Sequence, residues 1–429
     1  MDDFLKLVNT ENIRSCVSII LVSSFLAACA PRNTIQDISI AELRALEQGN
    51  KIQTSNQPTK KPTNKTINKK KDFCSIVINP GDSFDGAFDD MKAGDTLCLK
   101  DGLYQQAMDI PSNMHVRAVN DGQVEIDGYS KLGEEWSGGL VQMKGSNSSV
   151  RGLRVHHAGK NSHTCFMSGT NNAMRVMSCS HAGMHKHKNP VFMTGSGHLL
   201  ENSWIFGKGR YNVQCFLGRN MVIRGNVARW DTTTLKTLSE PNAAFSIYNC
   251  SNMTIENNIS LDYGHSEQFM KFGGDFYSPQ NPRKWPEGNN NNHYLGNYAI
   301  NHALGNGNRK GLRFEAEGIA KNNVVRDFYV NGSDFGIVFS KNEKGLIIEN
   351  CTFKNIIRAK IAGGGKNKRR ICSGSAEIGA KYKNRVKVSN KLFPWPNEEL
   401  IKADLCRSGE RQSTWCSTNK SLSDYVQTF

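Results

Sequence analysis

The sequence predicts an all-β protein whose chain winds into a right-handed parallel β-helix, a solenoid of about nine coils. A four-residue motif (apolar, any, Asn, small or apolar) recurs at intervals of 23 to 40 residues, most of them close to 25. Glycines expected in turns recur in step with it, and short segments of alternating apolar and polar residues lie between the two markers. Self-similarity at such a period is typical of stacked repeats, in which neighbouring coils bury a core that one coil cannot. The motif copies begin at Val150, Val176, Leu200, Ile223, Ile255, Leu295, Ala320 and Ile348, and the turn glycines are Gly159, Gly183, Gly209, Gly264, Gly305 and Gly332.

Composition excludes several classes of protein. The 429 residues include 54 Lys and Arg against 39 Asp and Glu, a net charge of +15, and the mean hydropathy is −0.51. This is too polar for a bundle of membrane-spanning helices and too rich in apolar segments for a wholly disordered chain. A charge of this sign predicts an anionic partner, such as an acidic polysaccharide, a nucleic acid or an anionic surface.

The N-terminal residues predict export from a bacterial cell. An apolar run from Cys16 to Leu26 follows Lys6 and Arg14, and it is short enough for a signal peptide rather than a membrane span. It ends in Leu-Ala-Ala-Cys29, which resembles a bacterial lipoprotein processing box. We therefore expect a signal peptide over 1–28, a lipid on Cys29, and an outer-membrane lipoprotein held only by that lipid; the alternative is an ordinary signal peptide with an incidental cysteine. Export argues against a nucleic acid partner.

Residues 29–72 are expected to form a disordered basic tether. The stretch from Gly49 to Asp72 consists mainly of Lys, Asn, Thr, Gln and Pro, and it offers too little apolar surface to fold. The lysines of this stretch supply part of the net charge of the chain. The net charge is therefore weaker evidence about the partner of the folded domain.

Cysteine use fits an exported protein. Apart from Cys16 and Cys29 there are ten cysteines, an even number in a compartment where disulfides persist. We expect Cys74 with Cys98, and Cys406 with Cys416, to close the two ends of the domain.

The β-helix is expected over 73–361, with a cap at each end. Phe84, Phe88 and Met91 are spaced for a helix within 82–92 that covers the first coil. The period is lost in 362–429, which predicts an irregular C-terminal cap and tail. A β-propeller or sandwich would need hairpin turns that the sequence does not show.

Two coils carry insertions, at 231–241 and 275–292, and such insertions usually gather on the binding face. Alternation places Leu312 and Phe314 inside the coil and Arg313 outside. The same argument, applied one coil earlier, places Lys271 outside. With the insertion removed, Lys271 and Arg313 are one coil apart, so their side chains are expected to be neighbours.

Two neighbouring outward cations suit β-elimination from a uronic acid. An arginine neutralises the sugar carboxylate, and a lysine whose pKa is lowered by that arginine removes the adjacent proton. Carboxylates nearby have the oxygen atoms that Ca²⁺ prefers, so a calcium ion is a candidate cofactor. The expected ligands are Glu267, Glu315 and Glu317.

These segments resemble the alginate lyase and chondroitinase B group of β-helix lyases. The resemblance rests on Glu267-Gln-Phe-Met-Lys271, Tyr294-Leu-Gly-Asn-Tyr298 and Gly311-Leu-Arg313. It implies that Lys271 is the base and Arg313 the acid, beside carboxylates that bind Ca²⁺. The family usually has His and Gly after its arginine, where this chain has Phe314 and Glu315. The segment that starts at Lys271 also resembles a β-helix pectate lyase group.

Histidines are concentrated in one part of the chain: seven of the eleven lie within 156–198. Cys179, His181, His185 and His187 are candidate ligands for a transition metal, whereas His156 and His181 fit equally well as stacked turn residues. A saccharide groove beside Lys271 is the other interpretation. Its expected substrate-binding residues are His163, His187, Arg210, Asn212 and Tyr248.

The leading hypothesis is a monomeric, surface-tethered polysaccharide lyase that cleaves an acidic glycan. The main alternative is a glycan-binding or adhesive β-helix lipoprotein without catalysis. A β-helix hydrolase ranks lower, because no paired Asp stands out on neighbouring coils. Asparagines at the coil corners are expected to form an internal hydrogen-bonded ladder.

Overall fold

The computed structural model describes residues 73–129, 132, 138–159, 162–181, 188–207, 210–230, 243–261, 267–273, 290–301, 309–315, 320–340, 342–363, 370–371, 398–407 and 414–427. All of them belong to one compact unit, Lys70–Phe429. The expected signal peptide, Cys29 and the tether lie outside the described residues. The described helices include none that is both long and apolar enough to cross a membrane.

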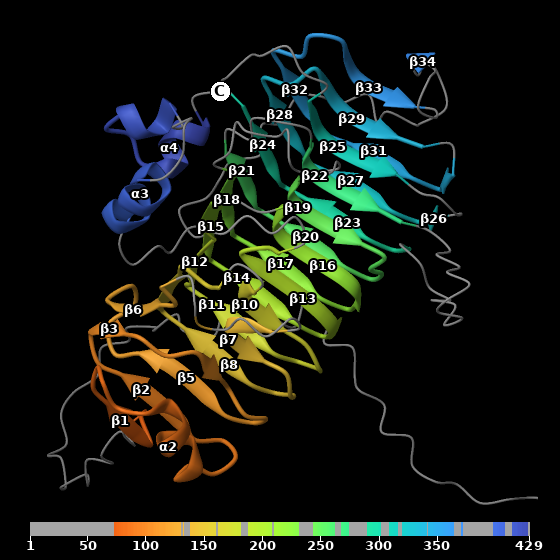
Figure 1. The fold of residues 1–429 in the computed structure, drawn as a ribbon. Coiled ribbons are helices and arrows are strands. Elements are labelled where there is room, and N and C mark those ends of the chain that lie inside the picture. The colour runs from red at the N-terminus through yellow and green to blue at the C-terminus, as the bar shows by residue number, and fades with distance from the viewer. Residues whose placement is uncertain are drawn as a thin grey trace, which may run out of the picture. The chain divides into compact units, whose positions relative to one another are not determined.

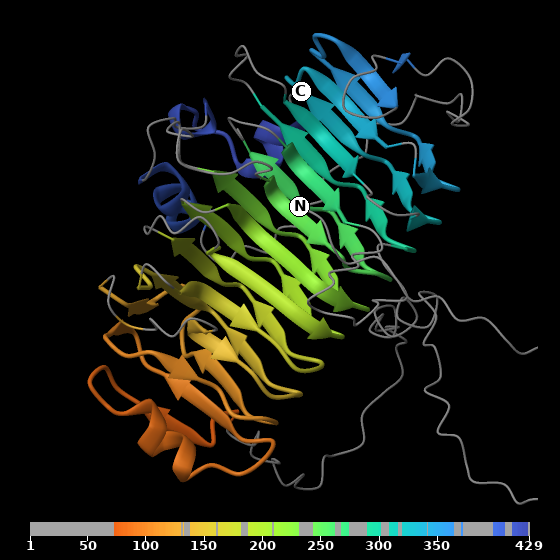
Figure 2. The same cartoon turned by 45° about the vertical axis from the view of Figure 1, so that its right-hand side comes forward.

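Three long sheets share the chain, and successive strands move from sheet to sheet (Figures 1 and 2). Sheet A contains, in order, β1 (Ile76–Ile78), β2 (Thr96–Leu99), β5 (His115–Ala118), β8 (Ser149–Arg151), β11 (Ala173–Arg175), β14 (Leu199–Glu201), β17 (Val222–Arg224), β20 (Thr254–Glu256), β23 (His293–Leu295), β27 (Val324–Arg326) and β31 (Ile347–Glu349). Sheet B contains β3 (Gly102–Tyr104), β6 (Val124–Asp127), β9 (Leu153–His156), β12 (Ser178–His181), β15 (Trp204–Gly207), β18 (Val227–Trp230), β21 (Ile259–Leu261), β24 (Tyr298–Ile300), β28 (Tyr329–Asn331) and β32 (Thr352–Lys354). Sheet C contains β4 (Met108–Asp109), β7 (Gly139–Met143), β10 (His163–Met167), β13 (Val191–Ser196), β16 (Tyr211–Arg219), β19 (Ala243–Tyr248), β22 (Glu267–Phe272), β25 (Lys310–Glu315), β29 (Phe335–Phe339), β33 (Ala359–Gly363) and β34 (Arg370–Ile371).

This arrangement is a parallel β-helix, which confirms the predicted fold class. Apart from β1 and β34, each coil contributes one strand to each sheet, and among the described residues the strand pairings within the three sheets are parallel except that of β34 with β33. Sheet B has 10 strands, close to the nine coils expected. Parallel strands joined by crossovers wind right-handedly in nearly all cases, because of the right-handed twist of the strands. Strands β26 (Ala320–Lys321) and β30 (Glu343–Lys344) form a separate two-stranded parallel sheet.

The corners of the coil explain the repeated asparagines. Between sheets A and B the backbone is left-handed, with φ of 49° at Asn202 and 54° at Asn257. Between sheets C and A it is left-handed again, with φ of 57° at Asn322. Asn tolerates this conformation better than most residues, since its short polar side chain forms local hydrogen bonds. Copies of the sequence motif therefore lie at two different corners of the coil.

The expected asparagine ladder is present. Asn226 donates through Nδ2 to Oδ1 of Asn258 over 3.0 Å, and Asn258 donates in the same way to Asn297. All three are buried. A buried amide without partners would cost free energy, so stacking identical amides keeps the polar corner inside the fold.

The expected N-terminal cap and both expected terminal disulfides are present. Helix α2 (Phe84–Asp89) begins after the N-cap Ser83 and buries Phe84 and Phe88 against the first coils. The predicted disulfides Cys74–Cys98 and Cys406–Cys416 are both present.

Two further disulfides lie in the middle coils, Cys165–Cys179 and Cys215–Cys250. Because Cys179 is oxidised, the sequence-based proposal that it ligates a metal with the neighbouring histidines is wrong. Of that proposed set, His185 and His187 lie outside the described residues, and so does the side chain of His181.

The C-terminal segment was expected to cover the last coil, but its described part packs on the outer face of sheet B. It contains α3 (Glu398–Arg407), the 3-10 turn η2 (Thr414–Ser417) and α4 (Leu422–Gln427). Trp415 and Leu405 share an apolar cluster with Trp204 of β15. Figure 1 shows α3 and α4 beside this sheet, and α3 contacts β15.

One carboxylate, that of Asp404 on α3, fixes this attachment. It accepts hydrogen bonds from Arg154, from the hydroxyl of Ser178 and from Nε1 of Trp204. The Asp404 residue is 2 % exposed. A buried carboxylate is stable only while its hydrogen-bond donors stay in place. Because these donors belong to strands of sheet B, they hold α3 in one position against that sheet.

Candidate functional site

Sheet C decides which predicted site residues reach the surface. Strand β22 pairs with β25 so that Phe269 lies opposite Leu312 and Lys271 lies opposite Phe314. Phe269, Leu312 and Phe314 all belong to the buried core, so Lys271 also points into the coil. The prediction that Lys271 faces outward beside Arg313 is wrong by one residue of register.

The interior accommodates Lys271 because it provides a carboxylate. Nζ of Lys271 lies 2.5 Å from Oε1 of Glu343, and both side chains are fully buried. The other oxygen of Glu343 accepts a hydrogen bond from Nδ2 of Asn323. Burial lowers the pKa of Lys271, while the charge of Glu343 opposes that shift. A side chain enclosed in this way cannot act as a base on a polysaccharide outside the coil.

Arg313 lies on the outer face of sheet C, as predicted. It pairs opposite Met270 and forms an ion pair with Glu315 on its own strand. Both side chains are about one-fifth exposed, 19 % and 20 %. Of the three glutamates expected to bind Ca²⁺, only Glu315 has a described side chain; Glu317 and the side chain of Glu267 lie outside the described residues.

The outer face of sheet C also carries a row of aromatic side chains that sequence reasoning missed as a group. We call it the aromatic strip, and its residues are His163 and Phe166 on β10, Phe192 on β13, Phe216 on β16 and Tyr248 on β19. The ring centroids of His163 and Phe192 are 4.4 Å apart, those of Phe192 and Phe216 6.1 Å, and those of Phe216 and Tyr248 5.3 Å.

The strip is partly open to solvent. Phe192, Phe216 and Tyr248 are half-buried, and Phe166 is 7 % exposed. A contiguous row of partly exposed aromatic rings, unlike a single exposed one, is typical of a binding surface. The strip could have been found from the sequence by aligning Phe166, Phe192 and Phe216 at the repeat period.

His163 has a fixed proton arrangement within the strip. Its Nδ1 accepts a hydrogen bond from the backbone N–H of Asn189 over 3.1 Å. In the neutral ring the proton is therefore on Nε2, which makes His163 a donor rather than a general base.

Two cations lie near the starts of β13 and β16. Lys188 lies three residues before Val191, the first residue of β13, and Arg210 directly precedes β16. The guanidinium of Arg210 lies 5.2 Å from the ring centre of Tyr211. Burial lowers the pKa of Lys188. Of the remaining predicted substrate-binding residues, Asn212 is fully buried, which removes it from the accessible surface, and His187 lies outside the described residues.

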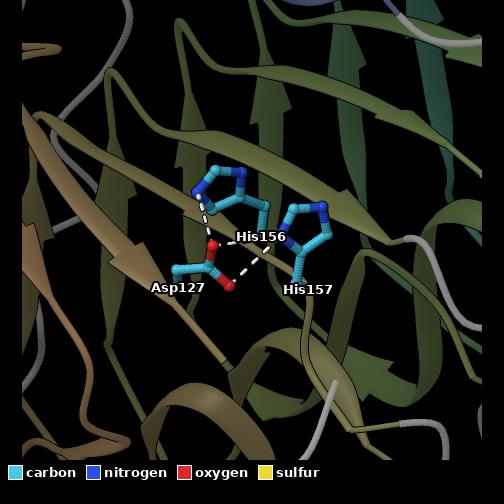
Figure 3. A group of neighbouring side chains, drawn as sticks. All are labelled: Asp127, His156 and His157. Carbon is cyan, nitrogen blue, oxygen red and sulfur yellow. Dashed lines mark hydrogen bonds and ion pairs between the residues drawn. The ribbon is translucent and has the colours of Figure 1, made fainter. Parts of the chain in front are cut away.

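A second cluster of polar groups lies on the outer face of sheet B. The side chains of Asp127, His156 and His157 converge there (Figure 3), and their ligand atoms all lie within 4.8 Å of one another. This cluster includes two members of the predicted histidine group, but neither belongs to the saccharide groove or to the metal set expected from the sequence.

Comparison with known proteins gives fold-level likenesses only. No family model and no curated protein matches the sequence. Among solved structures, a tailspike protein of an Acinetobacter baumannii bacteriophage, a capsular polysaccharide depolymerase, is 13% identical over 63% of this chain and 52% of its own, with a TM-score of 0.40. This chain thus spans about half of that tailspike.

Two further solved structures are similar to the same extent. A mannuronic acid specific polysaccharide family 6 lyase from human gut microbiota is 14% identical over 68% of this chain and 78% of its own, with a TM-score of 0.42. The surface adhesin PfbA of Streptococcus pneumoniae is 11% identical over 65% of this chain and 88% of its own, with a TM-score of 0.36. Fold alone does not assign function.

Proposed function

We propose that the protein binds an acidic polysaccharide along the outer face of sheet C. The observation that carries this proposal is the aromatic strip, which crosses four neighbouring strands of one sheet. Aromatic rings present a broad apolar surface on which the C–H faces of sugar rings stack. Because adjacent strands are about 4.8 Å apart, a chain of sugars that crosses the strands meets one ring after another.

The cations near the strip select for an acidic chain. Arg210 directly precedes β16, which carries Phe216 of the strip, and Arg313 lies on the outer face of sheet C, three strands from β16. Glu315 holds the guanidinium of Arg313 in the free protein. A sugar carboxylate is a comparable bidentate partner and competes for the same guanidinium.

The binding experiment compares acidic and neutral glycans. Alginate, pectate and chondroitin sulfate are expected to retard the protein in affinity electrophoresis, whereas dextran is not. Phe216→Ala and Tyr248→Ala should each weaken binding about tenfold, which corresponds to about 1.4 kcal/mol. Phe73→Ala is the matched control, since Phe73 is an aromatic residue that is 73% exposed and lies outside the strip. Equal loss of binding in the control, or none in the strip variants, would contradict the proposal.

Cleavage by β-elimination is the second candidate function, and Lys188 is the observation that favours it. Its lowered pKa, caused by burial, brings a lysine closer to the range of a useful base. The test is the ultraviolet absorbance of an unsaturated uronate product. Product that disappears in Lys188→Ala, with binding retained, would assign a lyase; binding without product would assign a glycan-binding or adhesive protein.

A calcium cofactor belongs to the lyase alternative. If Glu315 joins Glu267 and Glu317 in holding Ca²⁺, a chelator should reduce product formation and Ca²⁺ should restore it. Glu315→Gln should require a higher Ca²⁺ concentration for the same rate, which is measured by titrating the ion into the treated enzyme.

We further propose that Cys29 carries a lipid that holds the protein in the bacterial outer membrane. Only a thiol can accept the diacylglyceryl group, so Cys29→Ser should move the protein from the membrane fraction to the soluble fraction. An unchanged membrane fraction would contradict the anchor without affecting the glycan proposal.

A further inference from the structure

The outer face of sheet B brings two histidines and an aspartate together on adjacent coils. Asp127 ends β6 and lies opposite His156, the last residue of β9. His157 follows directly, with a left-handed backbone (φ 52°) that turns its side chain back toward Asp127. Figure 3 shows the three side chains pointing toward one another from these two strands.

The distances between the polar atoms fit a common ligand. Nδ1 of His157 lies 3.1 Å from both carboxylate oxygens of Asp127. Nε2 of His156 lies 4.0 Å from Oδ2 of Asp127. A zinc ion at about 2.0–2.2 Å from each of three ligands requires similar separations. Small side-chain rotations are therefore enough to surround one ion.

Nε2 of His156 is incompletely satisfied without an ion. It is buried and has no hydrogen bond of good geometry, although Oε1 of Glu125 lies 2.6 Å away. The His156 and His157 rings stack at 4.6 Å, which keeps the two imidazoles side by side next to Asp127.

The charges around the cluster favour a cation. Asp127 and Glu125 each contribute a carboxylate. Arg154, which forms an ion pair with Glu125, is held mainly by Asp404. The side chain of Asp127 is 12% exposed and that of His157 is 47% exposed. The site is thus walled by protein on one side and open to solvent on the other.

We propose that Asp127, His156 and His157 bind one divalent transition metal ion of the Zn²⁺ class. Imidazole nitrogen and carboxylate oxygen are the ligands that zinc takes, whereas Ca²⁺ and Mg²⁺ prefer oxygen alone. Three protein ligands leave a fourth position on the open side for water or for an oxygen of a bound molecule. Oε1 of Glu125 lies 2.6 Å from the same Nε2 of His156, so this carboxylate adds negative charge beside the ion.

The test is calorimetric titration of the untagged full chain with Zn²⁺. The matched variants are Asp127→Asn, which keeps the shape of the side chain, and His157→Ala; the control is His293→Ala, an exposed histidine on sheet A. Wild type and the control should show the same high-affinity site. Both ligand variants should lose at least the roughly 10- to 100-fold in affinity that even an outer-shell substitution costs.

A second readout separates binding from folding. Co²⁺ replaces Zn²⁺ and absorbs visible light, so the wild type should develop a Co²⁺ band that Asp127→Asn lacks. The ligand variants should unfold at the wild-type urea concentration in the presence of a chelator. The proposal is overturned if wild type shows no high-affinity site, or if both ligand variants bind Zn²⁺ as the control does.

Discussion

One ion pair inside the coil and one row of rings outside sheet C depart from the usual placement of polar and apolar groups. Inside, Lys271 and Glu343 form an ion pair that is closed to solvent. Outside, Phe192, Phe216 and Tyr248 form a row of half-buried rings. The charged groups inside have partners from the protein, and the outer rings are partly open to solvent.

This contrast shows that residue type alone does not locate a binding site in a solenoid. A lysine in a strand is normally taken to face water, because an isolated buried charge is very costly. Lys271 is inside because Glu343, 72 residues later in the sequence, supplies its counter-charge. The outer rings are placed outside by the strict alternation of the neighbouring strands. Variants on each side of the sheet should therefore affect different properties.

The largest expected loss of folding free energy follows from breaking the buried ion pair of Lys271 with Glu343. Lys271→Ala leaves the buried carboxylate of Glu343 without its counter-charge, which typically costs about 3–5 kcal/mol of folding free energy. Urea unfolding followed by circular dichroism should show this loss.

The control for Lys271→Ala is the double variant Lys271→Met with Glu343→Gln, which removes both charges and keeps most of the volume. It should recover much of the stability, because replacing both members of a buried pair is often nearly neutral. If Lys271→Ala unfolded like the wild type and instead abolished β-elimination, the inward orientation of Lys271 would be wrong.

The next effect concerns a charge that is buried on the outer face of sheet B. Asp404→Ala removes the acceptor shared by Arg154, Ser178 and Trp204. Hydrogen bonds to a charged group contribute about 1.5–3 kcal/mol, so we expect a loss of that order. Limited proteolysis should then release the C-terminal segment faster than from the wild type. Asp424→Ala, at an exposed position of α4, is the control and should be cleaved at the wild-type rate.

A smaller effect on stability is expected at the aromatic strip. Phe216 is half-buried and contacts its neighbours mainly through ring edges and faces, so Phe216→Ala should cost about 1 kcal/mol of folding free energy. The same variant is expected to lose glycan affinity. A loss of stability as large as that of Lys271→Ala would show that the strip is core rather than binding surface.

The repetitive parts of the fold were predictable from the sequence. The period, the capping helix at Phe84 and Phe88, the Asn226–Asn258–Asn297 ladder and two disulfides all follow from local patterns. Each depends on residues that repeat at the coil length or lie close together in the sequence.

The site was less predictable, because its residues depend on distant partners. The alternation in β22 admits two registers, and Met270 and Phe272 made the wrong one more apolar. Only the position of Glu343 on β30, two coils further along the chain, decides between them. The cluster of Asp127 with His156 likewise depends on a strand pairing that joins residues 29 positions apart.

The smallest expected effect on folding free energy concerns His198, a polar residue buried at a corner of the coil. His198 is 1% exposed; its Nδ1 accepts the backbone N–H of Asn172 and its Nε2 donates to the carbonyl of Thr194. It thus occupies the place that Asn292 and Asn323 take at the same corner of later coils.

Burial lowers the pKa of His198 below the usual value near 6.5, although its hydrogen bond to the Thr194 carbonyl opposes the shift. The unfolded chain therefore binds a proton at a higher pH than the folded protein does. The stability that this histidine contributes is complete above about pH 6.5 and is lost as the pH falls through the lower folded pKa.

His198→Asn replaces the ring with a ladder amide that does not titrate. It should change the unfolding free energy by less than about 1 kcal/mol at pH 8, and it should flatten the decrease between pH 8 and pH 5, measured by urea unfolding. The remaining slope should come in part from His156, whose pKa is also lowered by burial. If His198→Asn lost as much stability at low pH as the wild type does, His198 would not be kept neutral by burial. The interior would then not account for the acid sensitivity at this corner of the coil.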